Sequence, residues 1–160
     1  MTTTHYYTED QSTLDKGHKD LYRARAGALN LNPTSTDAER AVGLVLPELG
    51  GKMDGMAIRI SKPNISCIDF TFEALRSTSI AEINESMRTA SNRYLKVVLE
   101  TTNEKLVSMD LNHSSHLGIF ETDQTKIKNG TFCRILAWYG NEWGFPNRML
   151  DTTIENRKYI

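Results

Sequence analysis

The segments Met56-Ala-Ile-Arg-Ile60 and Ile65-Ser-Cys-Ile-Asp-Phe-Thr-Phe72 decide the fold class of this chain. Both are rich in β-branched and aromatic residues, which favour strands. The intervening Lys62-Pro63-Asn64 is a turn signal, because proline fixes φ and asparagine tolerates tight turns. The sequence therefore predicts two strands paired with each other, in which Arg59 interrupts an apolar run.

Helical spacing of apolar residues occurs on either side of these strands. The pattern from Asp37 through Leu46 predicts a short helix that ends at Pro47. Ser35, Thr36 or Asp37 is expected to cap its start. The N–H groups at such a start make it a chemically suitable phosphate site.

The second half of the chain predicts a helix, further strands and a final helix. Ile80–Ala90 has helical spacing, and an amphipathic helix is expected from Glu142 onwards. Strand-like runs follow the first of these helices at Val107–Leu111, Gly118–Phe120, Thr125–Ile127 and Thr131–Tyr139. Asn129-Gly130 is a strong hairpin signal between the last two runs.

These elements predict a single α+β domain over residues 1–160. We expect one mostly antiparallel (mixed) sheet with helices on one face. A long ordered loop with short helical turns is expected from about Tyr6 to Thr36. Its positive and negative side chains balance, so a salt-bridged surface is one interpretation, but loops of this length are often functional.

Composition excludes several classes of protein. The chain has 160 residues, 39% hydrophobic and 24% charged, with a formal charge of −1, so no basic field favours nucleic acid. Neither a membrane-spanning run nor a secretory signal is evident, and a cytoplasmic location is expected. Cys67 and Cys133 match no zinc spacing and are expected to be buried, reduced thiols.

Six ordered strings then connect the chain to a known family. They are Thr2-Thr-Thr-His-Tyr-Tyr-Thr-Glu-Asp-Gln11, His18-Lys-Asp-Leu-Tyr-Arg-Ala-Arg-Ala26, Pro33-Thr-Ser-Thr36, Ala57-Ile-Arg-Ile60, Pro63-Asn-Ile-Ser66 and Trp138-Tyr-Gly-Asn-Glu-Trp-Gly-Phe145. Together they resemble the C-terminal catalytic domain of phosphorylating glyceraldehyde-3-phosphate dehydrogenases. Erythrose-4-phosphate dehydrogenases are similar to the same pattern, and these strings do not separate the two substrates.

The resemblance implies an oxidoreductase of glycolysis that converts glyceraldehyde 3-phosphate to 1,3-bisphosphoglycerate. In that family a cysteine thiolate attacks the aldehyde, hydride passes to NAD, and inorganic phosphate releases the acyl group. NADP stays open, because the residues that read the ribose belong to the dinucleotide-binding half. The long early loop resembles a segment that lines a neighbouring subunit's cofactor groove, which implies a homotetramer.

The resemblance also assigns site residues in this chain. His5 falls where the family places its base, and an imidazole can exchange a proton near neutral pH. Thr8 and Arg59 match positions that bind the substrate phosphate, and Thr36 matches a second site for the attacking phosphate. Asn141 matches the residue that hydrogen-bonds the nicotinamide amide, although an asparagine here is also an ordinary helix cap.

Three departures from the family pattern favour an alternative function for this chain. The family places glycine after Thr36, whereas this chain has Asp37, whose charge is expected to weaken phosphate binding. Aspartate is usual where Gly140 stands, and Pro146 lies within the expected final helix. The alternative is therefore a degenerate, non-catalytic or oligomerising domain of the same ancestry.

The family's nucleophile string, Ser-Cys-Thr-Thr-Asn-Cys, has no counterpart in this sequence. We expect the chain to begin downstream of it, so that the chain alone is inactive and needs a complementary dinucleotide-binding half. A Cys–His hydrolase built from Cys67 and His5 has no motif behind it. His113-Ser-Ser-His116 offers two metal ligands without a third, so no metal site is expected.

Overall fold

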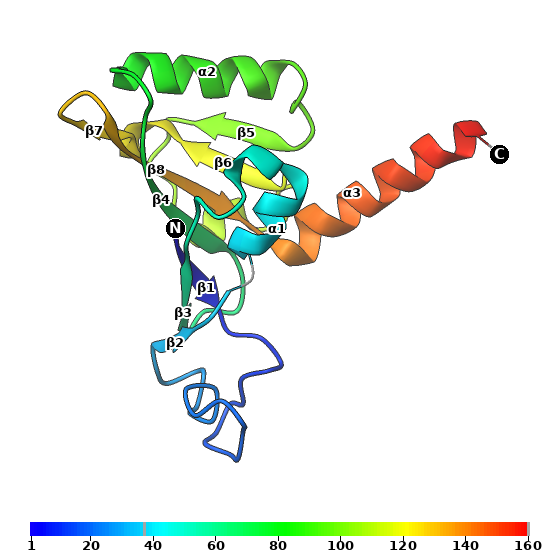
Figure 1. The fold of residues 1–160 in the computed structure, drawn as a ribbon. Helices are drawn as coiled ribbons and strands as arrows, with labels where there is room; N and C mark the ends of the chain where they lie inside the picture. Colours follow the sequence, from blue (N-terminus) through cyan, green and yellow to red (C-terminus); the bar gives the residue numbers. More distant parts are fainter. Residues whose placement is uncertain (37, 160) are drawn as a thin grey trace. The chain divides into compact units, whose positions relative to one another are not determined.

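A computed structural model describes residues 1–36 and 38–159 of the chain, and for residues 39 and 40 it describes the backbone only. The chain divides into two compact units, Met1–Phe70 and Thr71–Ile160. The α+β class and the mixed sheet expected from the sequence are confirmed (Figure 1). Within the described ranges, no helix combines the length and the apolar character that crossing a membrane requires.

The first unit is organised around its first strand. The strand order is β2-β3-β1-β4, with β1 at Thr2–Tyr6, β2 at Asn32–Thr34, β3 at Met56–Ile60 and β4 at Ser66–Glu73. The last three residues of β4, 71–73, belong to the second unit. β1 pairs parallel with β3 and antiparallel with β4. The prediction that β3 and β4 pair with each other is therefore wrong, because β1 lies between them.

The amino-acid types of β1 explain why it was not recognised. Three consecutive threonines have β-branched side chains that favour an extended backbone. They lack the alternation of apolar and polar residues by which strands are usually recognised. Tyr6 closes the strand, with its ring buried and its N–H donated to Ser66 Oγ at 3.3 Å.

The short helix of the first unit begins as predicted. α1 spans Ala38–Val45, and the 3-10 helix η1 follows at Pro47–Leu49. Thr36 Oγ1 accepts the N–H of Ala38, the first residue of α1, at 3.2 Å. The third candidate cap, Asp37, lies outside the described residues.

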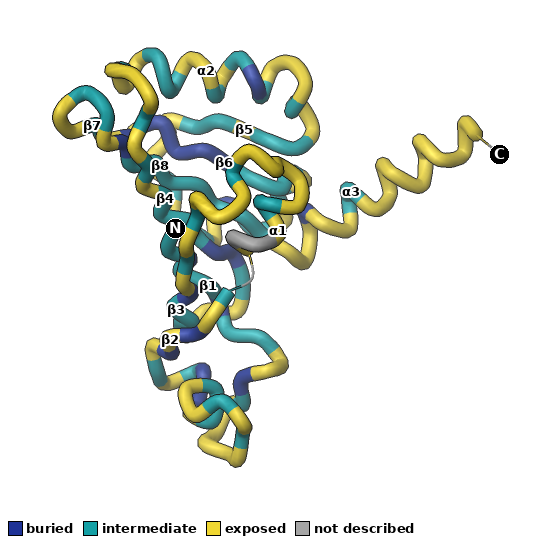
Figure 2. Tube along the Cα trace, viewed as in Figure 1, coloured by how far each residue is buried: buried dark blue, intermediate teal, exposed yellow. Residues whose placement is uncertain are grey.

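The long loop between β1 and β2 is a series of turns held by polar contacts. Asp10 contacts Arg23 and lies 3.3 Å from His18, and Asp15 lies 3.1 Å from Arg25, which confirms the salt-bridged surface. The bond from Arg23 lowers the pKa of Asp10, and the N–H of Ala26 lowers that of Asp15. Most of this loop is exposed or half-buried, and its buried residues are Gln11, Ala26 and Gly27 (Figure 2).

One buried asparagine anchors this loop to the sheet. Asn32 begins β2, is 3% exposed, and donates from Nδ2 to the carbonyl oxygens of Tyr22 at 2.7 Å and Arg25 at 3.3 Å. Because an unsatisfied buried amide is costly, these bonds fix the far end of the loop against the strand that pairs with β3.

The second unit contains the remaining strands. They are β5 at Leu99–Thr102, β6 at Gly118–Glu121, β7 at Lys126–Lys128 and β8 at Phe132–Tyr139. β5 and β6 run parallel, whereas β8 is antiparallel to β6 and β7. Asn129 and Gly130 both have positive φ, 54° and 76°, which confirms the turn between β7 and β8.

Two expectations in this unit are wrong. Ser108–Leu111 forms a 3-10 helix, η2, instead of a strand, because the carboxylate of Asp110 accepts the N–H of Val107 at 2.8 Å and closes a turn. β5 was not predicted, since its Thr101 and Thr102 give it little apolar character. The 3-10 helix η3 covers Thr122–Gln124.

Two helices belong to the second unit. α2 spans Ile80–Asn92 and packs against β5 (Figure 1), and Ser79 Oγ caps it by accepting the N–H of Glu82 at 3.1 Å. α3 spans Asn141–Asn156, followed by η4 at Arg157–Tyr159. Pro146 is its sixth residue, beyond the first turn, where its lack of an N–H removes one helix bond.

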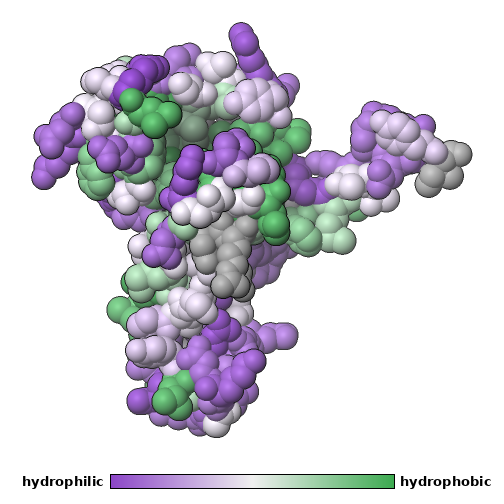
Figure 3. Space-filling model, in the orientation of Figure 1, coloured by the Kyte–Doolittle hydropathy of each residue, from purple (hydrophilic) through white to green (hydrophobic). Residues whose placement is uncertain are grey.

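The core of the second unit leaves much of α3 uncovered. Phe120 and Cys133 are fully buried, whereas α3 is mostly exposed (Figure 2). Apolar surface is visible among polar atoms in the space-filling view (Figure 3). The exposed apolar side chains of α3 are Trp143, Phe145, Met149, Leu150 and Ile154.

Candidate functional site

Two residues expected at a site lie side by side in the first unit. In the parallel pairing of β1 with β3, His5 is the partner of Arg59, so both side chains extend from the same face of the sheet. Arg59 Nη1 lies 2.8 Å from His5 Nδ1. The structure therefore joins a titratable imidazole to a guanidinium, although 54 residues separate them in the sequence.

A backbone carbonyl completes this contact. The Tyr6 carbonyl oxygen lies 2.7 Å from His5 Nδ1 and accepts a bond from Arg59 Nη1 at 3.3 Å. The rings of His5 and Tyr6 have centroids 4.4 Å apart. Sequence reasoning missed the carbonyl, because a main-chain acceptor leaves no signal in side-chain types.

A strained residue directly precedes Ser66, the hydrogen-bond partner of the Tyr6 N–H. Ile65 is 5% exposed and has φ of 61°, a left-handed conformation that costs a β-branched residue about 1–3 kcal/mol. Its N–H is donated to Asn64 Oδ1 at 2.8 Å. The next residue, Ser66, accepts the N–H of Tyr6, so burial and two hydrogen bonds hold the turn that supports the site.

The two threonines assigned to phosphate binding lie on connecting segments of the same unit. Thr8 follows β1 in a turn where its carbonyl accepts the N–H of Gln11 at 2.9 Å. The N–H of Thr8 is donated to Gln11 Oε1 at 3.3 Å. The hydroxyl oxygen of Thr36 accepts the N–H of Ala38 at the start of α1.

Asn141 lies in the second unit and is exposed as the first residue of α3. The helix starts one residue earlier than expected, at Asn141 instead of Glu142, so Gly140 takes the capping position and supplies no side-chain bond. Gly144 fixes this helix start: a Cβ there would lie 2.7 Å from the His116 carbonyl oxygen. In the sequence Gly144 stood out only as a member of the string Trp138–Phe145. Its physical role is to let the start of α3 lie close to the backbone of His116.

A buried carboxyl lies on the strand beside β8. Glu121 is 5% exposed, and its Oε1 has no hydrogen-bond partner among the described residues. In the β6–β8 register, Ile119 faces Trp138, which makes Glu121 a diagonal neighbour of the indole. Burial raises the pKa of Glu121, and the indole N–H of Trp138 and the charge of Lys105 offset only part of this effect.

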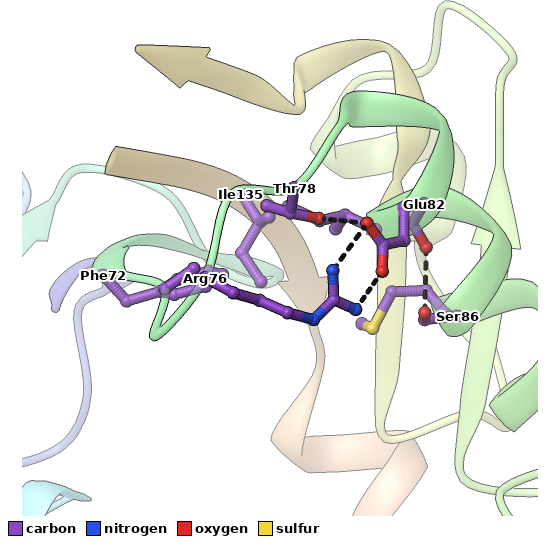
Figure 4. Close-up of a pocket in the computed structure, with 9 residues that line it drawn as sticks. Phe72, Arg76, Thr78, Glu82, Ser86 and Ile135 are labelled. Atoms are coloured by element: carbon purple, nitrogen blue, oxygen red, sulfur yellow. Dashed lines mark hydrogen bonds and ion pairs between the residues drawn. The ribbon is translucent and has the colours of Figure 1, made fainter. Parts of the chain in front are cut away.

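A cavity of about 290 Å³ lies between α2 and the end of β4 in the second unit (Figure 4). Its wall is largely apolar, and its charges are paired: Arg76 contacts the Glu82 carboxylate, which also accepts the Thr78 hydroxyl at 2.8 Å. These contacts, led by Arg76, lower the pKa of Glu82. This ion pair stabilises the start of α2. Because the charges of Arg76 and Glu82 neutralise each other, the pair offers no net charge to a ligand.

The remaining histidines and the cysteines take structural positions. His113 stacks on Trp143 with centroids 4.9 Å apart, and His116 Nδ1 lies 3.2 Å from Glu100. In the described part of the chain no group of three His, Cys, Asp or Glu side chains could hold a metal. Cys133 is buried, as expected, but Cys67 is only half-buried, and no disulfide joins these two described residues.

Comparison with known proteins identifies the family of this chain. Residues 1–141 match the family described as glyceraldehyde 3-phosphate dehydrogenase, C-terminal domain. Glyceraldehyde-3-phosphate dehydrogenases of Cereibacter sphaeroides and Xanthobacter flavus are each 56% identical over 154 residues, covering 96% of this chain and 46% of the relative. The enzyme of Zymomonas mobilis is 45% identical over 161 residues, covering 100% of the chain and 48% of the relative.

The chain therefore spans about half the length of the curated relatives it matches. The match covers both units, from the strand that carries His5 to the first residue of α3. On this evidence the chain belongs to the glyceraldehyde-3-phosphate dehydrogenase family, as a C-terminal domain.

Proposed function

We propose that this chain supplies the substrate-binding and proton-transfer part of a phosphorylating glyceraldehyde-3-phosphate dehydrogenase, as one domain over residues 1–160. The contact between His5 and Arg59 is the observation that carries the proposal. The contact is 2.8 Å between an imidazole and a guanidinium. An imidazole is suited to proton exchange near neutral pH, and a guanidinium is suited to binding phosphate. The substrate of the family has an aldehyde and a phosphate, which need these two kinds of group.

The roles follow from the chemistry of each side chain. His5 acts as the base toward the thiol and the aldehyde, and Arg59 and Thr8 bind the substrate phosphate through charge-assisted and neutral hydrogen bonds. Thr36 takes part in binding the attacking phosphate at the start of α1, where helix N–H groups attract anions. Asn141, exposed at the start of α3, bonds the amide of nicotinamide in NAD or NADP.

In this proposal neither Cys67 nor Cys133 is the nucleophile. Cys67 is the antiparallel partner of Thr4, and neighbouring residues of a strand alternate between faces, so His5 and Cys67 extend from opposite faces of the sheet. Cys133 is buried in the second unit. Cys67 therefore does not face His5, the side chain of Cys133 is fully buried, and the chain alone is expected to be inactive.

The partner implied is a dinucleotide-binding half, with assembly into a homo-oligomer as in the tetramer suggested by the resemblance. The exposed apolar side chains of α3 support a partner surface, because exposed apolar area of this kind is usually covered. The same observation favours the second candidate, a non-catalytic domain that associates without turnover. Both candidates are compatible with a cytoplasmic protein.

The experiment is reconstitution. The chain is fused behind the dinucleotide-binding half of a relative, nucleophile string included, and NAD reduction is measured with glyceraldehyde 3-phosphate, with and without inorganic phosphate. We expect phosphate-dependent turnover from the fusion, none from the chain alone, and a loss of about 10²–10⁴ in rate in the H5N variant. A folded fusion without turnover would favour the non-catalytic candidate, and faster turnover of erythrose 4-phosphate would identify the other substrate.

A further inference from the structure

Two features weaken the start of α3 as a helix. Gly140 takes the capping position and supplies no side-chain bond. Its carbonyl oxygen accepts the N–H of Gly144 at 3.1 Å, but Pro146 has no N–H with which to continue this pattern. Because a helix start without a side-chain cap is less stable, the position of Asn141 depends on contacts between α3 and other parts of the second unit.

The segment His113–Leu117 supplies two such contacts. The imidazole of His113 lies against the indole of Trp143, with ring centroids 4.9 Å apart and planes inclined by 60°, a geometry in which aromatic rings attract each other. The carbonyl of His116 passes so close to Gly144 that a Cβ there would lie 2.7 Å from its oxygen. The two contacts meet adjacent residues of α3, so together they restrict rotation of its first turn about the helix axis.

This segment is itself fixed to the sheet of the second unit. The N–H groups of Leu117 and Gly118 are both donated to the Val98 carbonyl oxygen, at 2.9 and 3.1 Å. His116 Nδ1 lies 3.2 Å from the carboxylate of Glu100 in β5. Because β5 and β6 are paired strands, the segment connects the start of α3 to a rigid part of the fold.

The backbone of His113 indicates that the direction of its ring matters. Its φ is 65°, in the left-handed region that a residue other than glycine adopts infrequently. Such a conformation persists only where the surrounding structure holds it, and it is often found at functional sites. Here the next residue, Ser114, donates its N–H to the Leu111 carbonyl oxygen at 3.1 Å, which closes the turn that directs the imidazole towards the indole.

We propose that His113 and Trp143 are positioning residues for Asn141, whose ring contact holds the first turn of α3 in the orientation that binds the amide of nicotinamide. Residues two positions apart on a helix do not share a face, so the indole can be held while Asn141 stays exposed to a cofactor. A pair of amides needs a donor and an acceptor aligned together, and rotation of the helix start would misalign both.

This inference rests on the proposed cofactor role of Asn141. It goes beyond that role, because it assigns a function to two side chains that act on the cofactor only through the helix start. A contact that merely stabilises the fold would change the free energy of unfolding. A positioning contact also changes the affinity for NAD, and it does so only while Asn141 is present.

The test measures the Kd of NAD by isothermal titration calorimetry in the fusion with the dinucleotide-binding half, so that no turnover is required. H113N removes the ring but keeps a residue type that tolerates the left-handed conformation. Y159A is the matched control, since it removes an exposed ring beyond the other end of α3. We expect Kd to rise about two- to tenfold in N141A, to rise about two- to fivefold in H113N, and to stay unchanged in Y159A.

A double-mutant cycle separates positioning from general destabilisation. When Asn141 is already replaced by alanine, H113N should cause no further rise in Kd. W143F keeps an aromatic ring and should bind NAD like the wild type, whereas W143A should resemble H113N. If H113N does not fold, W143A with and without N141A decides. A rise of equal size in the presence and absence of Asn141 would overturn the positioning role.

The same measurements distinguish failure of this inference from failure of the proposed function. If N141A weakens NAD binding while H113N and W143A do not, the positioning role is overturned and the cofactor role of Asn141 stands. If N141A leaves the Kd unchanged, or if the fusion does not bind NAD, the cofactor role fails and this inference fails with it.

Discussion

Replacing Gly144 by alanine tests how closely the start of α3 packs against the segment before β6. A Cβ at this position would lie 2.7 Å from the His116 carbonyl oxygen and 3.3 Å from Leu117 Cα. The first distance is about 0.7 Å shorter than the 3.4 Å at which ordinary van der Waals contact begins. Because the neighbour is backbone, no side-chain rotation can relieve the overlap.

The expected change in stability combines two opposing terms. Forced overpacking of this kind costs about 1–3 kcal/mol, and a rigid backbone neighbour favours the upper half of that range. Alanine in place of glycine inside a helix returns about 1 kcal/mol. We therefore expect G144A to lower the free energy of unfolding by about 1–2 kcal/mol, measured by urea denaturation followed by circular dichroism.

The matched control is G17A, since a Cβ at Gly17 would meet nothing within 4 Å. This control should leave stability unchanged or raise it by about 0.4–1 kcal/mol. A G144A chain as stable as wild type, or more stable, would refute the close approach. In the reconstituted enzyme G144A should also weaken NAD binding, because it displaces the helix that begins with Asn141.

Three further predictions concern buried or capping groups. Burial holds the pKa of Glu121 above its ordinary value of 4.5. The folded chain therefore keeps a proton that the unfolded chain has released, and stability falls as pH rises above that ordinary value. E121Q should flatten this fall in the urea midpoint. S79A removes the cap of α2 and should cost about 1 kcal/mol by the same assay, whereas S79D should retain most of the stability. N32A removes the buried bonds to Tyr22 and Arg25, should cost about 1–3 kcal/mol, and should speed tryptic cleavage within residues 16–25; cleavage at the wild-type rate would contradict the anchoring role.

The elements with clear apolar periodicity were predictable from the sequence. α2 and β3 were found because their apolar residues recur at helical and strand spacing. β1 and β5 were missed because threonine is β-branched but only weakly apolar, so it favours strands without marking a buried face. The pairing of β3 with β4 was wrong because a turn signal shows that the chain reverses, but cannot show that another strand enters between the two arms.

The site was predictable only as a set of side chains. His5 and Arg59 were named through the family strings, and their shared register is a property of the sheet that no local pattern contains. The Tyr6 carbonyl and the left-handed Ile65 were invisible, because one is backbone and the other is a conformation that isoleucine ordinarily avoids. Asp37, a departure from the family pattern, lies outside the described residues.

The position of β1 between β3 and β4 has a consequence for how the chain acquires its structure. The strand that carries His5 precedes both of its partners in the sequence, which lie at residues 56–60 and 67–69. The chain must lose the conformational entropy of closing this long loop before the strands can pair and stabilise it, and this slows folding. A nascent chain that has not reached Asp69 contains the histidine but lacks part of the sheet that holds it, so the candidate base is synthesised well before the strands that fix its position.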